Sequence, residues 1–392
     1  MPRSPSKDDQ LNPFGWHVPR WVAFLASATG AVLGVATNLY SNEFRTGISS
    51  AGHLFGGELL SVLLAALVAS AITAVTYRWL VRQRQERTQI APGCIKIGAD
   101  VISIVKNEQD LVVGRELHYL EVKRESPELV IFLHGLGLDA QDFRPYMAES
   151  RYHCIALTLY RFNAGEQEDT HYRPISLSTH IQLLAYALTR IAARHPHKRM
   201  TLVGFSFGAD IIFLLAAEVA AVVRKLNISQ TLLLDPNVNS STTTISSRIA
   251  VIDPSRPIDE LTKILESADD VAEFRNLCHY LYKITAKNFA QVQRHAQDMI
   301  ALWPGHSYDT FLDRLGQLNA LVGGVHVVLS FDYEKNFNGI ARGAVTRGLD
   351  PGNLACSRVD HFDLIGAKFL KEQLEGVLPG PRVASTDPAR SG

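Results

Sequence analysis

Cysteine is scarce in this sequence, and the few cysteines that occur are far apart. Only four stand among 392 residues, at Cys94, Cys154, Cys278 and Cys356, and no two form a CxxC pair. This spacing excludes a zinc ribbon and a thioredoxin-like redox motif. Isolated cysteines usually behave as small, inert core residues, and unpaired thiols fit a reducing compartment.

An excess of charge of either sign is also missing. Lys+Arg and Asp+Glu number 39 each, so the formal net charge is zero. Because a nucleic-acid-binding chain usually carries a basic excess, no nucleic acid is expected as a partner. The sequence contains no P-loop, GxGxxG or HExxH motif and no paired metal-ligand spacing. It therefore predicts neither a cofactor nor a metal ion.

Two long stretches near the N-terminus lack charged residues, at 21–42 and 59–77. A membrane-spanning helix needs about 20 mostly apolar residues, and both stretches are long enough. Gly30 and Gly34 would let two such helices approach closely. The pattern predicts a transmembrane hairpin over 21–80, with helices at about 21–42 and 59–79. The alternatives are two buried soluble helices or a signal peptide, but a signal's apolar core is only about 7–15 residues long.

Basic residues near these stretches predict the orientation of the hairpin. Only Arg45 lies in the connecting loop, whereas Arg82, Arg84 and Arg87 follow the second stretch. Because cytoplasmic flanks of membrane helices are rich in Lys and Arg, both ends should be cytoplasmic. Residues 1–20 would then form an N-terminal cytoplasmic segment of a multi-pass membrane protein.

The remainder of the chain alternates strand-like and helix-like patterns. After a linker at 81–98, short apolar runs such as 128–135, 153–160 and 230–236 are separated by stretches with helical spacing. This alternation predicts an α/β domain over 99–378, with a mostly parallel sheet and helices on both faces. The alternation stops at about 239–322, where an insert of several helices, a cap, is expected. Residues 379–392 are predicted to be a disordered tail.

A serine lies between two glycines where a strand pattern meets a helix pattern. The segment reads Gly204-Phe205-Ser206-Phe207-Gly208. Glycines on both sides allow a sharp, strained turn, and the first N–H groups of the helix would point at the serine oxygen. The alternative is a Gly-Ser turn that has no catalytic role.

Together with the loop that begins His134-Gly135-Leu136, this motif resembles the α/β-hydrolase superfamily, over about residues 101–378. The resemblance implies that Ser206 is the nucleophile. It also implies that the backbone N–H groups of Leu136 and Phe207 form the oxyanion hole, and that His134 belongs to the structure of the loop.

The same resemblance implies a late histidine as the base and a carboxylate after one of the last strands. His361 follows the last predicted strand and precedes the final helix, where the superfamily keeps its base. Three carboxylates compete for the acid: Asp332 ranks first, Glu334 second and Asp235 third. The glycine that usually precedes the acid is missing near Asp332, so the motif does not fix which residue occupies the position of the acid.

Two functions remain open from the sequence. The first is a membrane-anchored serine hydrolase that cleaves a carboxylic ester or thioester of an apolar acid, lipids included, through an acyl-enzyme. The second is a catalytically inactive binding or scaffold protein with the same fold at the membrane. The sequence does not identify the substrate.

Overall fold

The computed structural model describes residues 76, 89–100, 108–163, 173–253, 257–266, 268 and 270–378. The chain divides into two units, Met1–Glu86 and Arg87–Gly392, and every described residue except Thr76 lies in the second. The predicted hairpin over 21–80, apart from Thr76, and the predicted tail over 379–392 lie outside the described residues. Within the described part of the chain, no helix combines the length and apolar content needed to cross a membrane.

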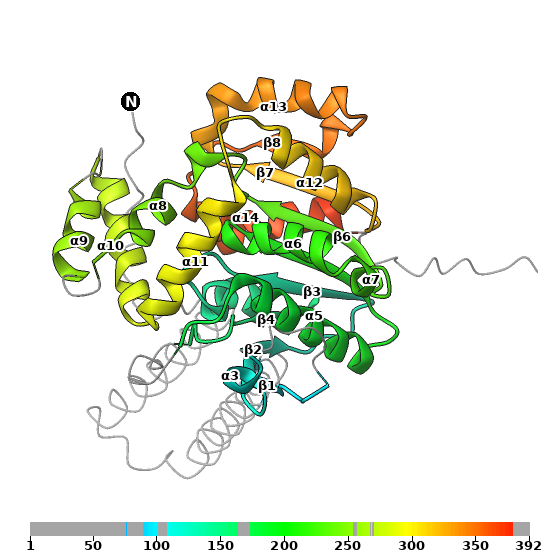
Figure 1. Cartoon of the computed structure of the whole chain (residues 1–392). Coiled ribbons are helices and arrows are strands. Elements are labelled where there is room, and N and C mark those ends of the chain that lie inside the picture. The colour runs from blue at the N-terminus through cyan, green and yellow to red at the C-terminus, as the bar shows by residue number, and fades with distance from the viewer. Residues whose placement is uncertain are drawn as a thin grey trace, which may run out of the picture. The chain divides into compact units, whose positions relative to one another are not determined.

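An eight-stranded sheet forms the centre of the second unit (Figure 1). The strand order is β1-β2-β4-β3-β5-β6-β7-β8; β2 is antiparallel to both of its neighbours, and the other adjacent pairs are parallel. The predicted mostly parallel sheet is therefore confirmed. The strands are β1 (Ala91–Lys96), β2 (Glu116–Val122), β3 (Glu128–Leu133), β4 (His153–Leu157), β5 (Arg199–Phe205), β6 (Ile228–Leu234), β7 (Val325–Leu329) and β8 (Leu354–Cys356).

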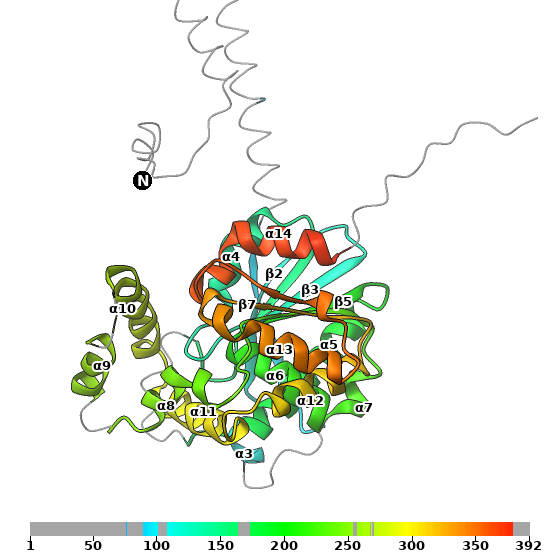
Figure 2. The same ribbon diagram turned by 90° about the horizontal axis from the view of Figure 1, so that it is seen from above.

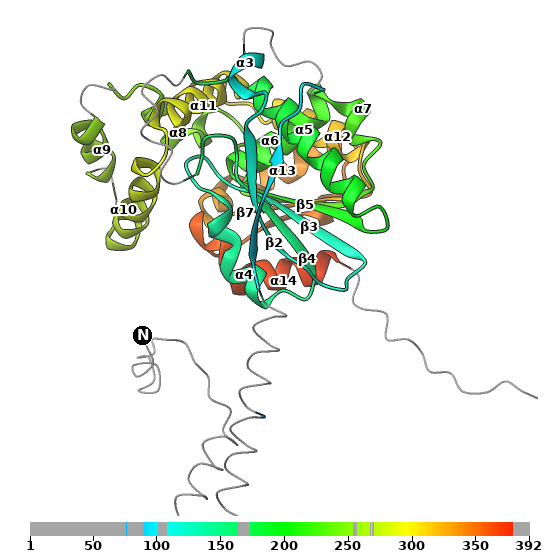
Figure 3. The ribbon, with the colours of Figure 1, turned by 90° about the horizontal axis from the view of Figure 1, so that it is seen from below.

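Helices cover both faces of this sheet, as predicted. Figures 2 and 3 show α4 and α14 on one face and α5, α6 and α12 on the other. Because both faces are covered, a central strand such as β3 is buried along its whole length and forms a continuous apolar run. The helices are α3 (Gln109–Val112), α4 (Arg144–Glu149), α5 (Leu177–Arg194), α6 (Phe207–Glu218), α7 (Ala220–Val223), α8 (Thr244–Ala250), α9 (Pro257–Leu265), α10 (Val271–Thr285), α11 (Phe289–Leu302), α12 (Asp309–Asn319), α13 (Glu334–Thr346) and α14 (Ala367–Val377).

The connection between β6 and β7 contains the helical insert predicted at 239–322. Helices α8, α9, α10 and α11 form the cap, and α9 and α10 stand apart from the sheet (Figure 1). The next helix, α12, packs against α6 and β7 and so belongs to the layer that covers the sheet. The insert therefore holds both the cap and one helix of the sheet's own layers.

The first strand lies where the sequence predicted a linker. Strand β1 falls within 81–98 and pairs with β2 from Ala91↔Glu121 to Lys96↔Glu116. Its side chains are mostly exposed and it contains Pro92, because an edge strand needs neither apolar residues on both faces nor every backbone donor. The apolar run 101–105, which follows β1 in the sequence, lies outside the described residues.

The four cysteines are free, but their surroundings differ from the prediction. Only Cys154 is buried; Cys94 is exposed on the edge strand, and Cys278 and Cys356 are half-buried. The expectation of core thiols therefore holds for one of the four.

Candidate active site

Ser206 occupies a strained turn between β5 and α6. Its backbone has φ 51° and ψ −120°, a conformation that residues other than glycine rarely adopt. The Ser206 N–H donates to the carbonyl of Leu234 at 2.8 Å, and its own carbonyl accepts from the N–H of Ala209 at 2.8 Å. The side chain is half-buried. Such strain persists only where the surrounding structure enforces it, and it marks candidate functional sites.

The two glycines of the motif are required by close backbone contacts. A Cβ atom on Gly204 would lie 2.6 Å from the Cα of Ala209. A Cβ atom on Gly208 would lie 2.1 Å from the carbonyl oxygen of Leu133. No side chain fits at these distances, so the predicted tight turn is confirmed, and the first turn of α6 packs directly against the end of β3.

His361 forms a short hydrogen bond with Asp235. Nδ1 of His361 lies 2.5 Å from Oδ2 of Asp235, while Oδ1 of Asp235 accepts the backbone N–H of Ser330 at 2.6 Å. The carboxylate of Asp235 is 3% exposed and the imidazole is 28% exposed. Since a carboxylate only accepts, Nδ1 carries the proton of this bond, and in the neutral imidazole Nε2 is then the nitrogen with the free lone pair. This tautomer is the one that a general base requires.

The two carboxylates ranked above Asp235 do not pair with His361 in the structure. Asp332 is exposed in the 3₁₀ helix Phe331–Tyr333, where it accepts from the Ser330 hydroxyl at 3.4 Å. Partial burial and the nearby Asp235 raise the pKa of Asp332. Glu334 is the exposed first residue of α13. The histidine therefore meets the carboxylate ranked third from the sequence. The reason is that β6 and β7 are adjacent parallel strands, so a carboxylate after either strand can reach the same place.

Aromatic rings hold the imidazole next to the turn. The ring of Phe205, the residue before Ser206, lies 4.6 Å from the ring of His361 between centroids. On another side, the ring of Phe362 lies 5.2 Å from the imidazole at an interplanar angle of 80°. This packing places His361 against Phe205, the residue directly before Ser206, although the two are far apart in the sequence.

The loop after β3 carries Leu136 beside this turn. Its first residue, His134, is fully buried: Nδ1 donates to the carbonyl of Gly135 at 2.8 Å, and Nε2 accepts the N–H of Leu159 at 3.0 Å. Burial lowers the pKa of His134 to about 4, so this imidazole is neutral and serves the structure of the loop. Gly137 turns the loop with φ 75°.

The predicted oxyanion donors are the backbone N–H groups of Leu136 and Phe207. Phe207 is the first residue of α6, so its N–H has no acceptor within the helix. The packing of Gly208 against Leu133 brings this end of α6 to the start of the loop that carries Leu136. A helix N-terminus beside such a loop is suited to bind a developing negative charge.

Cap helix α10 is bonded to two loops of the site. The hydroxyl of Tyr280 donates to the carbonyl of Leu136 at 2.9 Å, and the amide of Asn276 donates to Asp360, next to His361, at 3.0 Å. Two ion pairs join this region to the segment after Leu136: Lys283, in the last turn of α10, pairs with Asp142, and Lys287, just after the helix, pairs with Asp139. The sequence indicated an insert here but gave no sign of these contacts.

A buried acid links α6 to the loop that carries Asp235. Asp210 is completely buried, and one of its oxygens accepts from the side-chain amide of Asn237 at 2.6 Å. Burial raises the pKa of Asp210 to about 8, so its carboxyl is mostly protonated at neutral pH. This pair was not predicted from the sequence, although an Asp in the otherwise apolar run after Gly208 is a visible signal.

Comparisons with known proteins identify the fold. No family model matches the chain, and no curated protein matches its sequence. Among solved structures, a variant of AqdC, described as recognising and cleaving the ring of the Pseudomonas quinolone signal, superposes with a TM-score of 0.51 at 12% identity, covering 73% of this chain and all of that one. Together with the strand order, this likeness shows that the chain has the α/β-hydrolase fold.

Two other solved structures are similar at lower scores. A bacterial membrane phospholipase A, described as a virulence factor, has a TM-score of 0.46 at 16% identity, over 82% of this chain and 98% of that chain. A structure from a study of carboxylesterases of the thaumarchaeon Nitrososphaera gargenis has a TM-score of 0.47 at 14% identity, over 67% and 93%.

Proposed function

We propose that this protein is a serine hydrolase, anchored to a membrane, that cleaves a carboxylic ester or thioester. The observation that carries the proposal is the Asp235–His361 hydrogen bond at 2.5 Å, with the His361 ring packed on Phe205, the residue before the strained Ser206. A base with a fixed tautomer next to a strained serine is the arrangement that nucleophilic catalysis needs.

The proposed reaction has two steps. The Oγ of Ser206 attacks the acyl carbonyl while Nε2 of His361 takes the hydroxyl proton, and the Asp235 carboxylate stabilises the imidazolium that forms. The N–H groups of Leu136 and Phe207 stabilise the oxyanion. The imidazolium then gives its proton to the leaving alcohol or thiol. In the second step, His361 takes a proton from water, the hydroxide releases the acid, and Ser206 recovers its proton.

The surface of the cap favours an apolar, lipid-like substrate. Val271, Phe274 and Tyr282 are 75%, 47% and 73% exposed, and their spacing places them along one side of α10. Tyr280 and Ile284 on the opposite side are buried. Exposed apolar side chains in a row are typical of surfaces that meet lipid or other apolar partners.

The proposed anchor rests on the sequence alone. The uncharged stretches 21–42 and 59–77 and the arginines that follow the second stretch support a two-helix hairpin with the hydrolase unit on the cytoplasmic side. An anchored enzyme would meet lipid esters in the plane of the bilayer.

A fluorophosphonate probe tests the proposed activity on the full-length protein in detergent. We expect covalent labelling that is lost in Ser206→Ala, together with turnover of p-nitrophenyl esters that varies with acyl chain length. A folded wild-type protein that neither reacts with the probe nor turns over any ester of the series would contradict the proposal. The inactive binding protein of the same fold would then take its place.

A further inference from the structure

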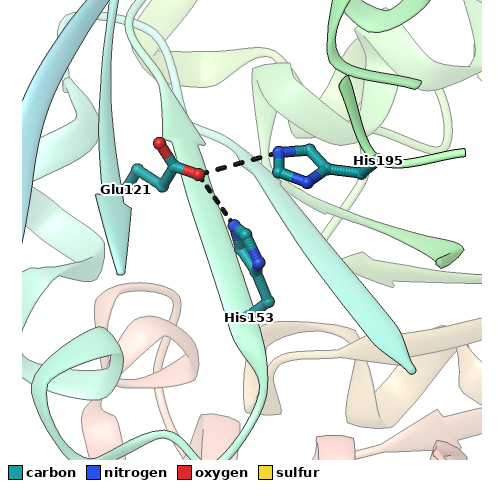
Figure 4. A group of neighbouring side chains, drawn as sticks. All are labelled: Glu121, His153 and His195. Atoms are coloured by element: carbon teal, nitrogen blue, oxygen red, sulfur yellow. Dashed lines mark hydrogen bonds and ion pairs between the residues drawn. The ribbon is translucent and has the colours of Figure 1, made fainter. Parts of the chain in front are cut away.

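A second group of polar side chains, Glu121, His153 and His195 (Figure 4), lies at the opposite end of the sheet from Ser206. His153 is the first residue of β4, whereas Ser206 follows the last residue of the parallel strand β5. Glu121 lies near the end of β2, and His195 directly follows the last residue of α5. Three separate elements thus bring two imidazoles and one carboxylate together.

The sheet register explains why two of these side chains share a face. Glu121 is paired with Ile155 of β4, and His153 stands two residues before Ile155. Because side chains alternate along a strand, Glu121 and His153 point to the same face. His195 reaches the group from the end of the helix that covers this face.

The potential ligand atoms converge on one point. Nε2 of His153 lies 2.9 Å from Oε1 of Glu121, and Nε2 of His195 lies 3.7 Å from the same oxygen. One ligand atom from each of the three residues lies within 4.8 Å of the other two. The side chains are 4%, 11% and 15% exposed for His153, Glu121 and His195, so the group is shielded but open to solvent on one side.

We propose that Glu121, His153 and His195 bind a divalent transition metal ion, with Zn²⁺ as the best fit. Two imidazole nitrogens and one carboxylate oxygen suit zinc, with water as a fourth ligand. Ligand atoms about 2.0–2.1 Å from a tetrahedral zinc lie roughly 3.3 Å from one another. The observed separations of 2.9 and 3.7 Å from Oε1 of Glu121 lie on either side of that distance.

A simple carboxylate–histidine hydrogen bond explains less of the arrangement. That bond needs only His153, and it does not account for Nε2 of His195, which lies 3.7 Å from the same oxygen while its ring packs edge-on against His153. The neighbouring cations are engaged elsewhere: Arg194 donates to the hydroxyl of Tyr119 at 2.7 Å, and Lys198 donates to the carbonyl of Arg124 at 3.1 Å. Among the described residues, this is the only group of three or more such ligands.

Metal binding here would tie the end of α5 to strands β2 and β4. Nε2 of His153 faces Oε1 of Glu121 in the metal-free form, so binding through Nε2 requires the imidazole tautomer that is protonated at Nδ1. A metal site was not predicted from the sequence, because the three proposed ligands come from separate segments and form no spacing motif. The site lies away from Ser206, so it should affect stability and leave ester turnover unchanged.

The experiment titrates ZnCl₂ into full-length protein freed of metal by a chelator, by calorimetry and by thermal unfolding. We expect saturation at one zinc per chain and an increase in Tm that EDTA reverses. His195→Gln should weaken binding by at least tenfold and abolish the increase. His197→Gln, an exposed histidine two residues away, should behave as wild type.

Co²⁺ provides a second readout that does not depend on stability. A tetrahedral site should give visible absorption bands for wild type and His197→Gln, and these bands should be lost in His195→Gln and Glu121→Gln. The proposal is overturned if the wild-type protein shows no saturable site for zinc, or if His195→Gln and Glu121→Gln bind zinc as tightly as wild type does.

Discussion

The side chains of Asp235 and His361 meet at 2.5 Å although 126 positions separate them in the chain. Asp235 directly follows β6 and itself has a positive φ of 49°, and its other oxygen is held by the backbone N–H of Ser330 at the end of β7. The carboxylate is thus fixed by two neighbouring strand ends before it orients the imidazole.

This relationship predicts which carboxylate matters most for activity. Asp235→Asn should lower kcat by roughly 10³–10⁴-fold, because an amide cannot hold the same tautomer or stabilise the imidazolium. Asp332→Asn is the matched control and should retain most activity, since Asp332 is exposed and accepts from the Ser330 hydroxyl rather than from His361 among the described residues. Steady-state ester kinetics on both variants decides between them; a larger loss in Asp332→Asn would return the role to the residue ranked first from the sequence.

The turn at Ser206 predicts that one substitution leaves folding intact and that another, two residues away, impairs it. Ser206→Ala should leave Tm nearly unchanged and lower turnover by about 10⁴–10⁶-fold, because only the hydroxyl oxygen is removed. Gly208→Val should impair folding as well as activity, since even a Cβ atom would lie 2.1 Å from the carbonyl oxygen of Leu133. Circular dichroism and ester assays measure both effects. Undiminished hydrolysis by a folded Ser206→Ala protein would reduce the motif to an ordinary turn.

The bond between the cap and the loop predicts a role for one tyrosine hydroxyl. Tyr280→Phe removes the hydrogen bond to the carbonyl of Leu136, which should cost about 1–2 kcal/mol. Because Leu136 is a proposed oxyanion donor, kcat should fall about 5- to 30-fold, equivalent to that free energy. Tyr282→Phe, on the exposed side of the same helix, serves as the control. Equal kcat values for the two variants would show that the hydroxyl does not position the loop.

The buried Asp210 predicts a pH dependence of stability. Its folded-state pKa of about 8 lies above its ordinary value of about 4, so folding takes up a proton between these two values. The free energy of unfolding should therefore fall by up to a few kcal/mol as pH rises from about 4 to about 8. Asp210→Asn should remove this pH dependence. The free energy of unfolding of the variant minus that of wild type should therefore be larger at pH 9 than at pH 5. Parallel curves of Tm against pH for the two proteins would contradict the prediction.

The proposed hairpin predicts the location of two points in the chain. Reporter fusions at Gln85 should show a cytoplasmic location, and fusions in the loop near Ser49 should show the opposite side of the membrane. The asymmetry of the flanking arginines is the physical reason. An external signal at Gln85 would contradict the proposed topology.

The sequence predicted those features that depend on local pattern. Continuous apolar runs marked the buried strands β3, β4 and β6, and the glycines beside Ser206 marked the turn. These features were predictable because two-sided burial and a close backbone approach leave direct traces in composition.

Features that depend on long-range geometry were not predictable in the same way. The ends of β6 and β7 lie side by side, so chain order alone could not separate Asp235 from Asp332. Strand β1 was not predicted because an exposed edge strand needs few apolar residues. The contacts of Tyr280 and the grouping of Glu121 with His195 arise only once distant elements pack together.

The cap helix α10 holds one loop through Tyr280 and Leu136 and another through Asn276 and Asp360. A helix bonded to both loops cannot swing aside without loosening the proposed oxyanion donor and the segment that carries His361. Any movement of α10 would therefore shift both loops together, so the position of the cap and the geometry of the proposed active site are mechanically coupled.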